Sequence, residues 1–359
     1  MAILPTSQSA IVGLSDGTLG ISHEAPVPEL ADDMLIVRNF AVSLNPVDTK
    51  IVGSLATPGA IAGVDYAGKV VAIGAKTKTA AKIEIGDRIC GTVQGMHSLT
   101  PAVGAFAQYV GANDITALKM PDGMSFEEGA SMGCVMGTIG MALFQSLQVP
   151  GTPTKPAEKP TTILVYGGST ACGTFAIQLL RLSGLIPITT CSPRNFDLVK
   201  SYGAEAVFDY HLTSAAAEIK SYTKNSLKFA LDCVSEPKTM EFCYKCIGRT
   251  GGRYTALEPF PEGSDKRPTV RADWVFGPAA LGKKIALPPP LAREENPIIR
   301  DWTLEWFRNI QYLADTGKVR LHPLDVIDGG FEGILRGLDL LKRKQVSARK
   351  LIVKIPQTE

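Results

Sequence analysis

Three closely spaced glycines could bring backbone N–H groups against a phosphate. Gly167 and Gly168 directly follow a short apolar run at residues 163–166, and Gly173 comes five residues later. Glycine allows close backbone approach, and the N–H groups at the start of a helix attract anions. Because an apolar helical pattern comes next, we interpret residues 162–184 as a strand, a glycine loop and a helix that open a nucleotide-binding βαβ unit.

The glycine loop is a variant of the dinucleotide-binding motif, so its meaning depends on the next segments of the chain. Thr170 and Ala171 interrupt the G-x-G-x-x-G spacing. Further β-rich runs come after the helix, with helical patterns between them, and this alternation predicts a doubly wound parallel sheet. The five predicted strands cover residues 163–166, 186–191, 204–210, 228–234 and 252–257. The alternative is a glycine-rich turn in an unrelated α/β protein.

The residues after the second predicted strand indicate which cofactor the loop would hold. NAD enzymes present Asp or Glu about 20 residues past the glycine loop, where it binds the ribose 2′-hydroxyl. Here that place holds Cys191-Ser192-Pro193-Arg194-Asn195. Ser192 and Arg194 offer a hydroxyl and a guanidinium to a 2′-phosphate, with Tyr210 as a second wall, so we expect NADPH. Alternatively, Arg194 is a surface residue at a helix start.

Size and composition narrow the class of protein. The chain has 359 residues, 45% hydrophobic and 20% charged, which is enough for two globular domains. A net charge of +2 without long basic runs argues against nucleic acid or an anionic membrane as a partner. The first residues lack a signal-peptide pattern, and no run approaches the roughly 18 apolar residues of a membrane span. We expect a cytoplasmic protein.

The cysteines and histidines predict no metal centre. Seven cysteines, an odd number, do not resemble a disulfide framework. The one C-x-x-C pair, Cys243 and Cys246, lies in a helical stretch with no second pair. The histidines, His23, His97, His211 and His322, are not at metal-ligand spacing.

The rest of the chain predicts a second architecture around the nucleotide unit. Residues 1–125 carry short β-patterned runs at 33–40, 66–73, 87–91 and 105–110, typical of a small antiparallel barrel or sandwich. Ser125 and Glu128 form a capping-box pattern before a helical region at 132–147. Later segments predict an irregular stretch at 258–297, helices at 301–315 and 331–342, and a closing strand at 350–355 that pairs with the N-terminal β domain.

Motifs over the whole chain resemble the medium-chain dehydrogenase/reductase superfamily. They lie at residues 44–50, 63–74, 85–88, 104–109 and 165–170. A more specific set resembles the trans-acting enoyl reductases of fungal polyketide synthases (lovastatin type), at residues 167–171, 180–184, 190–198, 222–225, 272–274 and 329–331. The resemblance implies an α/β protein with a GroES-like β-barrel catalytic domain and a doubly wound, Rossmann nucleotide domain. We expect the catalytic domain at 1–128 and 319–359, and the NADPH-binding domain at 129–318.

The resemblance also bears on metal use. Zinc alcohol dehydrogenases of the superfamily place a cysteine ligand where this chain has Asn45 and Pro46, and a histidine near Asp65. Both ligands and the four-cysteine structural lobe are missing. This implies the metal-free reductase branch, which includes quinone reductases, where hydride passes to an electron-poor alkene carbon without a Lewis acid.

The resemblance assigns residues to a cofactor site and a substrate site. The cofactor set is Val47, Asp48, Thr49, Lys50, Gly167, Gly168, Ser169, Thr170, Ala171, Cys172, Gly173, Ser192, Pro193, Arg194, Asn195, Tyr210, Ala256, Leu257, Val346 and Ser347. The substrate set is Thr138, Ile139, Gly140, Met141, Ala142, Leu143, Phe144, Gln145, Ser146, Val275, Phe276, Gly277, Pro278 and Ala279.

The implied reaction is hydride addition from NADPH to the β-carbon of an α,β-unsaturated thioester, followed by protonation of the α-carbon. Charge then develops on the thioester oxygen, where one donor is worth up to about 3 kcal/mol. Thr138 and Lys50 are the catalytic candidates. Thr138 could instead cap or pack a helix, and Lys50 could be solvated or hold cofactor phosphate or ribose. Without a Ser-His-Asp or Tyr-Lys constellation, water is a possible proton donor.

The expected partner is the acyl carrier domain of a highly reducing polyketide synthase or of a polyketide synthase-peptide synthetase hybrid. The alternatives are a stand-alone, zinc-free quinone or alkene reductase and a non-catalytic NADPH-binding protein. We further expect a monomer. The segment at 283–292, taken as the last strand of the nucleotide sheet, contains Pro288, Pro289 and Pro290, which cannot donate the hydrogen bonds of a two-fold strand pairing.

Overall fold

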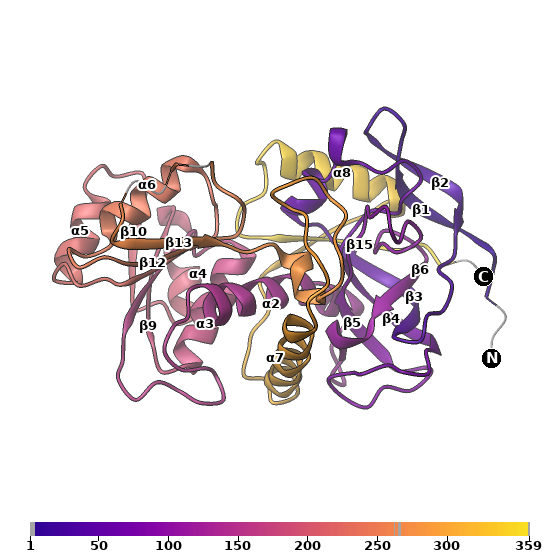
Figure 1. Ribbon diagram of the computed structural model, residues 1–359, viewed down its shortest axis with the longest axis horizontal. Helices are drawn as coiled ribbons and strands as arrows, with labels where there is room; N and C mark the ends of the chain where they lie inside the picture. Colours follow the sequence, from indigo (N-terminus) through magenta and orange to yellow (C-terminus); the bar gives the residue numbers. More distant parts are fainter. Residues whose placement is uncertain (1–3, 262, 265–266, 358–359) are drawn as a thin grey trace. The chain divides into compact units, whose positions relative to one another are not determined.

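The computed structural model describes residues 4–261, 263–264 and 267–357 (Figure 1). It divides into two compact units: unit 1 contains Met1–Gly137 and Pro278–Glu359, and unit 2 contains Thr138–Gly277. The sequence placed the return to the catalytic domain later, at residue 319. Since a compact unit need not coincide with a functional domain, the expected boundaries stay a prediction.

Unit 2 is built on a six-stranded parallel sheet. Its strand order is β10-β9-β8-β11-β12-β13, and every neighbouring pair is parallel. The strands are β8 (Thr162–Tyr166), β9 (Ile186–Cys191), β10 (Ala206–Asp209), β11 (Phe229–Asp232), β12 (Gly252–Ala256) and β13 (Val270–Trp274). All five predicted strands are present, and the doubly wound parallel sheet is confirmed.

The sixth strand, β13, corrects two expectations. It lies in the stretch at 258–297 that we expected to be irregular. The sequence missed it because Arg271 and Asp273 are exposed along this edge strand, which therefore lacks an apolar run. The expectation that residues 283–292 form the last strand of the nucleotide sheet is wrong, since that segment belongs to unit 1 and forms one isolated bridge, between Ile285 and Arg293.

Four α-helices connect the strands of unit 2 from β8 to β12. They are α3 (Ala171–Leu182), α4 (Phe196–Ser201), α5 (Ala215–Tyr222) and α6 (Pro237–Cys246). The first one starts directly at the glycine loop, because the Thr170 side chain accepts a hydrogen bond from the Gly173 N–H at 2.9 Å and caps the helix. The apolar residues in the middle of α3, among them Phe175 and Leu179, are fully buried.

The helical region predicted at 132–147 has a more broken form. It consists of α1 (Phe126–Ala130), α2 (Gly133–Gly140) and the π-helix η4 (Met141–Ser146). The predicted capping box is confirmed: Glu128 N donates to Ser125 Oγ at 3.1 Å, and Ser125 N donates to the Glu128 carboxylate at 2.8 Å.

Unit 1 contains a seven-stranded sheet and a two-stranded sheet. The order of the larger one is β14-β15-β3-β4-β5-β7, with β6 also paired to β3. The strands are β1 (Ser7–Gly13) and β2 (Leu19–Pro26) in the small sheet, and β3 (Met34–Ser43), β4 (Asp65–Ile73), β5 (Arg88–Thr92), β6 (Tyr109–Asn113), β7 (Ala117–Lys119), β14 (Leu324–Ile327) and β15 (Lys350–Lys354) in the large one. The closing strand β15 pairs antiparallel with β3, as predicted (Figure 1).

One strand of unit 1 starts later than expected. The run at 105–110 predicted a strand, but β6 begins at Tyr109. The Asn39 side chain donates to the carbonyls of Ala105 and Ala107 at 2.8 and 2.9 Å, so a side-chain amide occupies the acceptors that a strand ladder would use.

Two long helices complete unit 1. Helix α7 (Pro297–Asp315) begins four residues before the predicted start, because Asn296 accepts a hydrogen bond from Ile299 N at 3.2 Å and Pro297 fits the first helical position. Helix α8 (Gly330–Lys342) agrees closely with the prediction.

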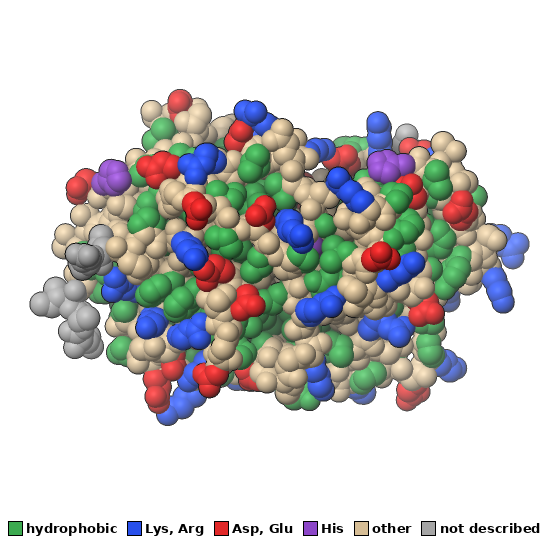
Figure 2. All heavy atoms as spheres, turned by 180° about the vertical axis from the view of Figure 1, so that it is seen from behind, with side chains coloured by type: hydrophobic (Ala, Val, Ile, Leu, Met, Phe, Trp, Pro, Cys, Tyr) green, Lys and Arg blue, Asp and Glu red, His purple; other side chains and the backbone are tan. Residues whose placement is uncertain are grey.

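The chain also contains short 3₁₀ turns. They are η1 (Pro46–Thr49), η2 (Gly53–Leu55), η3 (Asp114–Thr116), η5 (Pro193–Asn195) and η6 (Gly277–Leu281). On the face drawn in Figure 2, basic and acidic side chains are interspersed, in keeping with the small net charge.

Candidate functional site

The loop between β8 and α3 has a backbone that only glycine accommodates. Gly167 has φ +80°, in the left-handed region. A Cβ at Gly168 would lie 2.0 Å from Thr189 Oγ1, and one at Gly173 would lie 2.4 Å from the Gly167 carbonyl oxygen. The first turn of α3 therefore stands against a surface of bare backbone, which suits a pyrophosphate at the helix N-terminus. The loop fits the nucleotide that its sequence predicted.

A cluster of polar side chains, with Ser192 partly buried and Arg194, Tyr210 and His211 exposed, lies beyond the ends of β9 and β10. Ser192 Oγ is 3.1 Å from the Tyr210 hydroxyl and 3.4 Å from His211 Nε2. The Tyr210 and His211 rings are 4.2 Å apart between centroids. Arg194 is exposed in η5, two residues after Ser192. The structure thus brings together Ser192 and Tyr210, which the sequence selected, and adds His211.

Sequence reasoning considered His211 only as a metal ligand. Its position directly after Tyr210, at the end of β10, was the available signal. Its backbone N–H donates to Asp209 Oδ1 at 3.0 Å, which closes a turn and leaves the imidazole beside Ser192. Hydroxyls and an imidazole in one exposed cluster are donors suited to a phosphate group.

The structure brings Thr138 and Gly277 together within unit 2. A Cβ at Gly277 would lie 2.9 Å from Thr138 Oγ1, so the hydroxyl packs against bare backbone. Thr138 lies in α2 and is 9% exposed. The two segments of the predicted substrate set, 138–146 and 275–279, therefore meet at this pair.

Several other members of the predicted substrate set are buried or form hydrogen bonds within the protein. Ile139, Ala142 and Leu143 are fully buried. Ser146 Oγ lies 2.9 Å from Thr255 Oγ1 and donates to Asp273 at 2.7 Å, which ties η4 to β12 and β13. The remaining members of the set are partly or largely buried, and their role as a substrate wall stays a prediction.

Unit 1 contains a buried polar cluster centred on the carboxylate of Asp65. Ser43 Oγ and Asn45 Nδ2 each donate to Asp65 Oδ2 at 2.8 Å. The Cys134 N–H donates to Asp65 Oδ1 at 2.6 Å. The Lys350 ammonium lies 3.4 Å from Asp65 Oδ2 and also donates to Asn45 Oδ1. Asp65 is 0% exposed, and the ion pair with Lys350 and the three hydrogen bonds compensate the charge of its buried carboxylate.

Lys350 makes this cluster unsuitable for a cation. By the resemblance, zinc alcohol dehydrogenases hold one ligand at the place of Asn45 and another near Asp65, and the Lys350 ammonium contacts both of these side chains. A metal ion here would meet this positive charge at close range. Nor do three or more His, Cys, Asp or Glu side chains gather into a metal-binding group anywhere in the described ranges.

The turn after Asn45 carries four of the predicted cofactor residues, 47–50. The Asp48 carboxylate is buried and accepts a hydrogen bond from Asn45 N at 2.8 Å. Burial, foremost, raises the pKa of Asp48 to about 7, and the nearby Asp65 charge adds to the rise. Asp48 therefore acts mainly as the internal cap of η1, whereas Lys50 is exposed at its end.

The last predicted cofactor residues lie in two places. Ala256 ends β12 and is buried, and the Leu257 N–H donates to Ser235 Oγ at 2.8 Å. Val346 and Ser347 lie in unit 1, in the segment between α8 and β15. Each remains a predicted contact.

None of the helices in the described part of the chain combines the length and the apolar composition that a membrane span requires.

Two family models match the chain. The alcohol dehydrogenase GroES-like domain matches residues 31–122, and the zinc-binding dehydrogenase model matches residues 171–257. Among solved structures, an alcohol dehydrogenase superfamily protein from Novosphingobium aromaticivorans is similar with a TM-score of 0.77 at 21% identity, covering 98% of this chain and 100% of that one. The CurK enoyl reductase has a TM-score of 0.74 at 17% identity, with 98% and 100% coverage. At these identities the likeness shows the fold, and it confirms the predicted fold class.

Curated relatives are much closer. Trans-enoyl reductase FSL5 of Gibberella zeae is 60% identical over 357 residues, which covers 99% of each chain. Trans-enoyl reductase fsa3 of a Fusarium species is 47% identical, with 96% of this chain and 98% of the relative covered. The full-length match agrees with the motifs at both ends of the chain. The protein therefore belongs to the trans-enoyl reductases of the medium-chain dehydrogenase/reductase superfamily.

Proposed function

We propose that the protein is an NADPH-dependent enoyl reductase that reduces the α,β-double bond of a polyketide enoyl thioester presented by a partner polyketide synthase. Members of this superfamily use a nicotinamide dinucleotide. The observation that carries the proposal is the geometry of unit 2. There the glycine loop between β8 and α3 suits a pyrophosphate, and the cluster of Ser192, Tyr210 and His211 suits a further phosphate group of a dinucleotide. The full-length likeness to trans-enoyl reductases supports the choice of reaction.

The choice of NADPH rests on the chemistry at the ends of β9 and β10. Ser192 and Tyr210 supply hydroxyls, His211 an imidazole and Arg194 a guanidinium. Hydrogen bonds between such groups and a phosphate dianion are worth about 1.5–3 kcal/mol each when charge-assisted. The neighbouring carboxylate, Asp209, already accepts from the His211 N–H. The cluster thus favours a 2′-phosphate over a free 2′-hydroxyl.

NADPH, when bound, supplies the hydride that reaches the β-carbon of the enoyl group. The task of the chain is to stabilise the enolate charge that then develops on the thioester oxygen. Thr138 Oγ1, packed against Gly277, is the hydroxyl that we assign to this oxygen. Its low exposure, 9%, reduces competition from water. Replacement by valine keeps the shape and removes the donor, so Thr138→Val should lower kcat roughly 10- to 100-fold with little change in NADPH affinity.

Lys50 has a different role in this proposal. It is exposed at the end of η1, next to the buried Asp48 cap, and we assign it to the cofactor phosphate or ribose rather than to proton transfer. Water is then the proton donor to the α-carbon. Lys50→Met should accordingly raise the KM for NADPH and leave the pH profile of kcat unchanged.

The proposed partner is the acyl carrier domain of a highly reducing polyketide synthase or a polyketide synthase-peptide synthetase hybrid. Docking should be weak and polar, with lysines and arginines that steer an acidic carrier domain. We place the reaction in the cytoplasm, where the seven free cysteines would stay reduced. The expected monomer has lost its structural argument, since the proline segment is not part of the nucleotide sheet. Light scattering decides it: a mass near twice 38.3 kDa refutes the monomer.

One assay separates this function from its alternatives. NADPH oxidation is followed with a crotonyl thioester, with the same thioester on a carrier domain, and with a free quinone. We expect turnover of the thioesters, faster on the carrier. Turnover of quinone alone would make the protein a stand-alone reductase, and NADPH binding without any turnover would make it a binding protein. Equal rates for free and carrier-bound thioester would contradict the partner.

A further inference from the structure

Asp232 ends β11 at the point where the order of the parallel sheet reverses. From β8 the chain continues to β9 and β10 on one side of the sheet, whereas β11 and β12 lie on the other side. Open α/β sheets bind ligands outside the carboxyl ends of the strands at such a switch point. In the sheet register, Asp232 lies between Tyr166, which directly precedes the glycine loop, and Ala256, a member of the predicted cofactor set.

The carboxylate of Asp232 is 0% exposed and holds the turn that follows it. Val234 N and Ser235 N each donate to Asp232 Oδ1 at 2.9 Å. Ser235 Oγ also donates to the Asp232 carbonyl at 3.0 Å. Ser235 has φ +63°, in the left-handed region that residues other than glycine rarely adopt. The hydrogen bonds to Asp232 therefore stabilise an unusual backbone conformation.

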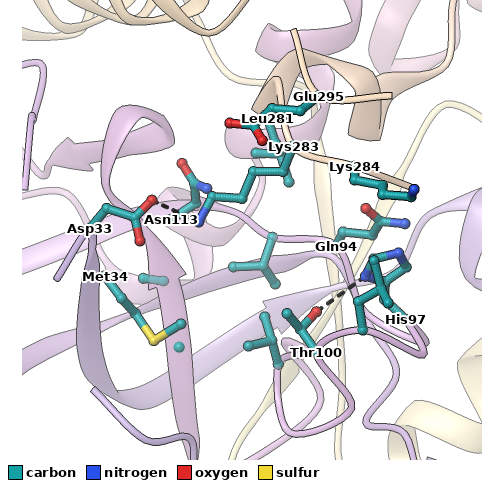
Figure 3. Close-up of a pocket in the computed structure, with 15 residues that line it drawn as sticks. Asp33, Met34, Gln94, His97, Thr100, Asn113, Leu281, Lys283, Lys284 and Glu295 are labelled. Atoms are coloured by element: carbon teal, nitrogen blue, oxygen red, sulfur yellow. Dashed lines mark hydrogen bonds and ion pairs between the residues drawn. The ribbon is translucent and has the colours of Figure 1, made fainter. Parts of the chain in front are cut away.

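The second carboxylate oxygen is anchored from the sheet and from α6. Thr239 Oγ1 donates to Asp232 Oδ2 at 2.5 Å, and the Tyr254 hydroxyl donates to it at 2.9 Å. All four donors to the carboxylate are uncharged. By contrast, the Asp33 carboxylate pairs with the Lys283 ammonium at 2.9 Å in the pocket of unit 1 that Figure 3 shows. A buried carboxylate without a counter-ion lowers the stability of a fold, and proteins keep such costs mainly at functional sites.

The turn at 233–235 contacts two segments of the predicted cofactor site. A Cβ at Gly167 would lie 3.0 Å from Val234 Cγ2, so the turn forms a wall beside the glycine loop. Ser235 Oγ accepts a hydrogen bond from the Leu257 N–H at 2.8 Å. The turn therefore fixes the position of the glycine loop relative to the residues that follow β12.

We propose that Asp232 is a positioning residue of the cofactor site, which holds the turn at 233–235 in place for the nicotinamide half of the dinucleotide. This role rests on the proposed function, because it requires a nicotinamide dinucleotide. The sheet order assigns the half. The cluster of Ser192, Tyr210 and His211, assigned to the 2′-phosphate, lies at the ends of β9 and β10, so the adenosine half belongs to that side of β8. Asp232 acts on the opposite side, at the ends of β11 and β12.

Two ligands separate positioning from a general loss of structure. NADPH contains both halves of the dinucleotide, whereas 2′,5′-ADP contains the adenosine half with its phosphates and lacks the nicotinamide half. Asp232→Ala removes the acceptor of Val234 N and Ser235 N, so it should weaken NADPH binding roughly 10-fold or more and change 2′,5′-ADP binding less than about threefold. Fluorescence titration measures NADPH, and calorimetry measures 2′,5′-ADP. Equal losses for both ligands, or an unchanged NADPH affinity, overturn the proposal.

Asp232→Asn is the conservative variant. Its amide oxygen can still accept from Val234 N and Ser235 N, so its NADPH affinity should stay within about threefold of the wild type. Losses of NADPH affinity as large as those of Asp232→Ala would show that holding the turn is not what matters.

A second pair of variants keeps the test valid if Asp232→Ala folds poorly. Tyr254→Phe removes one donor to the carboxylate and should weaken NADPH binding roughly two- to fivefold, with 2′,5′-ADP binding unchanged. The matched control is Tyr222→Phe, because Tyr222 is 48% exposed and its ring contacts Phe208. Equal NADPH affinities of the two phenylalanine variants would refute the role of Asp232.

The same titrations test the proposed function separately. A wild-type protein that binds neither NADPH nor NADH refutes the proposed reductase, and the role of Asp232 with it. A wild-type protein that binds NADPH, together with an Asp232→Ala variant of the same affinity, refutes the positioning role alone.

Discussion

The glycine loop of unit 2 and the buried cluster of unit 1 are held in opposite ways. The loop depends on the absence of side chains, since a Cβ at Gly168 would collide with Thr189. The cluster depends on the presence of particular side chains, because Asp65 is fully buried and stays compensated only while its donors and Lys350 are in place. One site should therefore lose binding when an atom is added, and the other should lose stability when a charge is removed.

The largest effect is expected at the cluster. Lys350→Met leaves the Asp65 carboxylate buried without its counter-ion, which should cost about 3–5 kcal/mol in the free energy of unfolding of unit 1. The control lies on the same strand: Lys354 pairs with Glu127 at 2.9 Å but is 66% exposed, so solvent screens this pair and Lys354→Met should change the stability far less. Urea denaturation of both variants measures the difference. Similar losses would show that the cluster contributes no more than a surface ion pair.

The same contrast explains what the sequence could predict. The loop and its helix are contiguous, so spacing and residue type were sufficient to predict them, although the capping role of Thr170 became clear only in the structure. The cluster joins Asn45 to Lys350, 305 residues later, and nothing local in β15 marks Lys350 as a buried partner. The resemblance indicated that zinc ligands were missing at Asn45 and near Asp65, but the sequence could not show what takes their place.

Edges and irregular segments were also hard to predict. Strand β13 has the alternating exposure of an edge strand, and its charged residues hid it from a search for apolar runs. The prolines at 288–290 were real chain-breaking signals, but without β13 they were assigned to the wrong sheet. His211 was missed because its partner, Ser192, comes from the neighbouring strand.

The second largest effect is expected at the glycine loop. Thr189 Oγ1 donates to the Val165 carbonyl at 2.6 Å, so it cannot move aside easily for a methyl group at Gly168. Gly168→Ala should weaken NADPH binding roughly 10- to 100-fold and lower stability by about 1–3 kcal/mol. Fluorescence titration measures the affinity. Gly137→Ala is the control, since its Cβ would lie 3.7 Å from Phe307, an ordinary contact. Equal losses of NADPH affinity in the two variants would contradict the role of the glycine loop in cofactor binding.

Asp48 adds a pH dependence to unit 1. Its pKa rises from 3.8 to about 7 in the folded protein, so between these values the folded state binds more protons than the unfolded state. Stability should therefore fall as the pH rises from about 4 to 7. At about 1.4 kcal/mol per pKa unit, the shift gives an upper bound of about 4 kcal/mol for this loss of stability. Relaxation of the protein around the charge should reduce the loss to about 1–2 kcal/mol.

Asp48→Asn tests this dependence, because the amide oxygen can still accept from Asn45 N while the ionisation is removed. The variant should show a flatter stability profile between pH 4 and 7 and a higher stability at pH 7. Urea midpoints at four pH values suffice for the comparison. A variant that is less stable at pH 7 than the wild type would mean that the ionised carboxylate is favourable in the fold.

The smallest effect concerns how His211 sharpens the nucleotide site. Its ring lies 3.4 Å from Ser192 Oγ, and an imidazole N–H can donate a hydrogen bond to a phosphate. His211→Ala should therefore weaken NADPH binding roughly two- to fivefold, whereas NADH binding should stay unchanged, since NADH lacks the 2′-phosphate. The preference for NADPH should persist, because Ser192, Arg194 and Tyr210 remain. Parallel titrations of both cofactors, with Gly168→Ala as the variant that weakens both equally, separate recognition of the 2′-phosphate from recognition of the pyrophosphate. An equal loss of NADPH and NADH affinity in His211→Ala would show that the imidazole does not contact the 2′-phosphate.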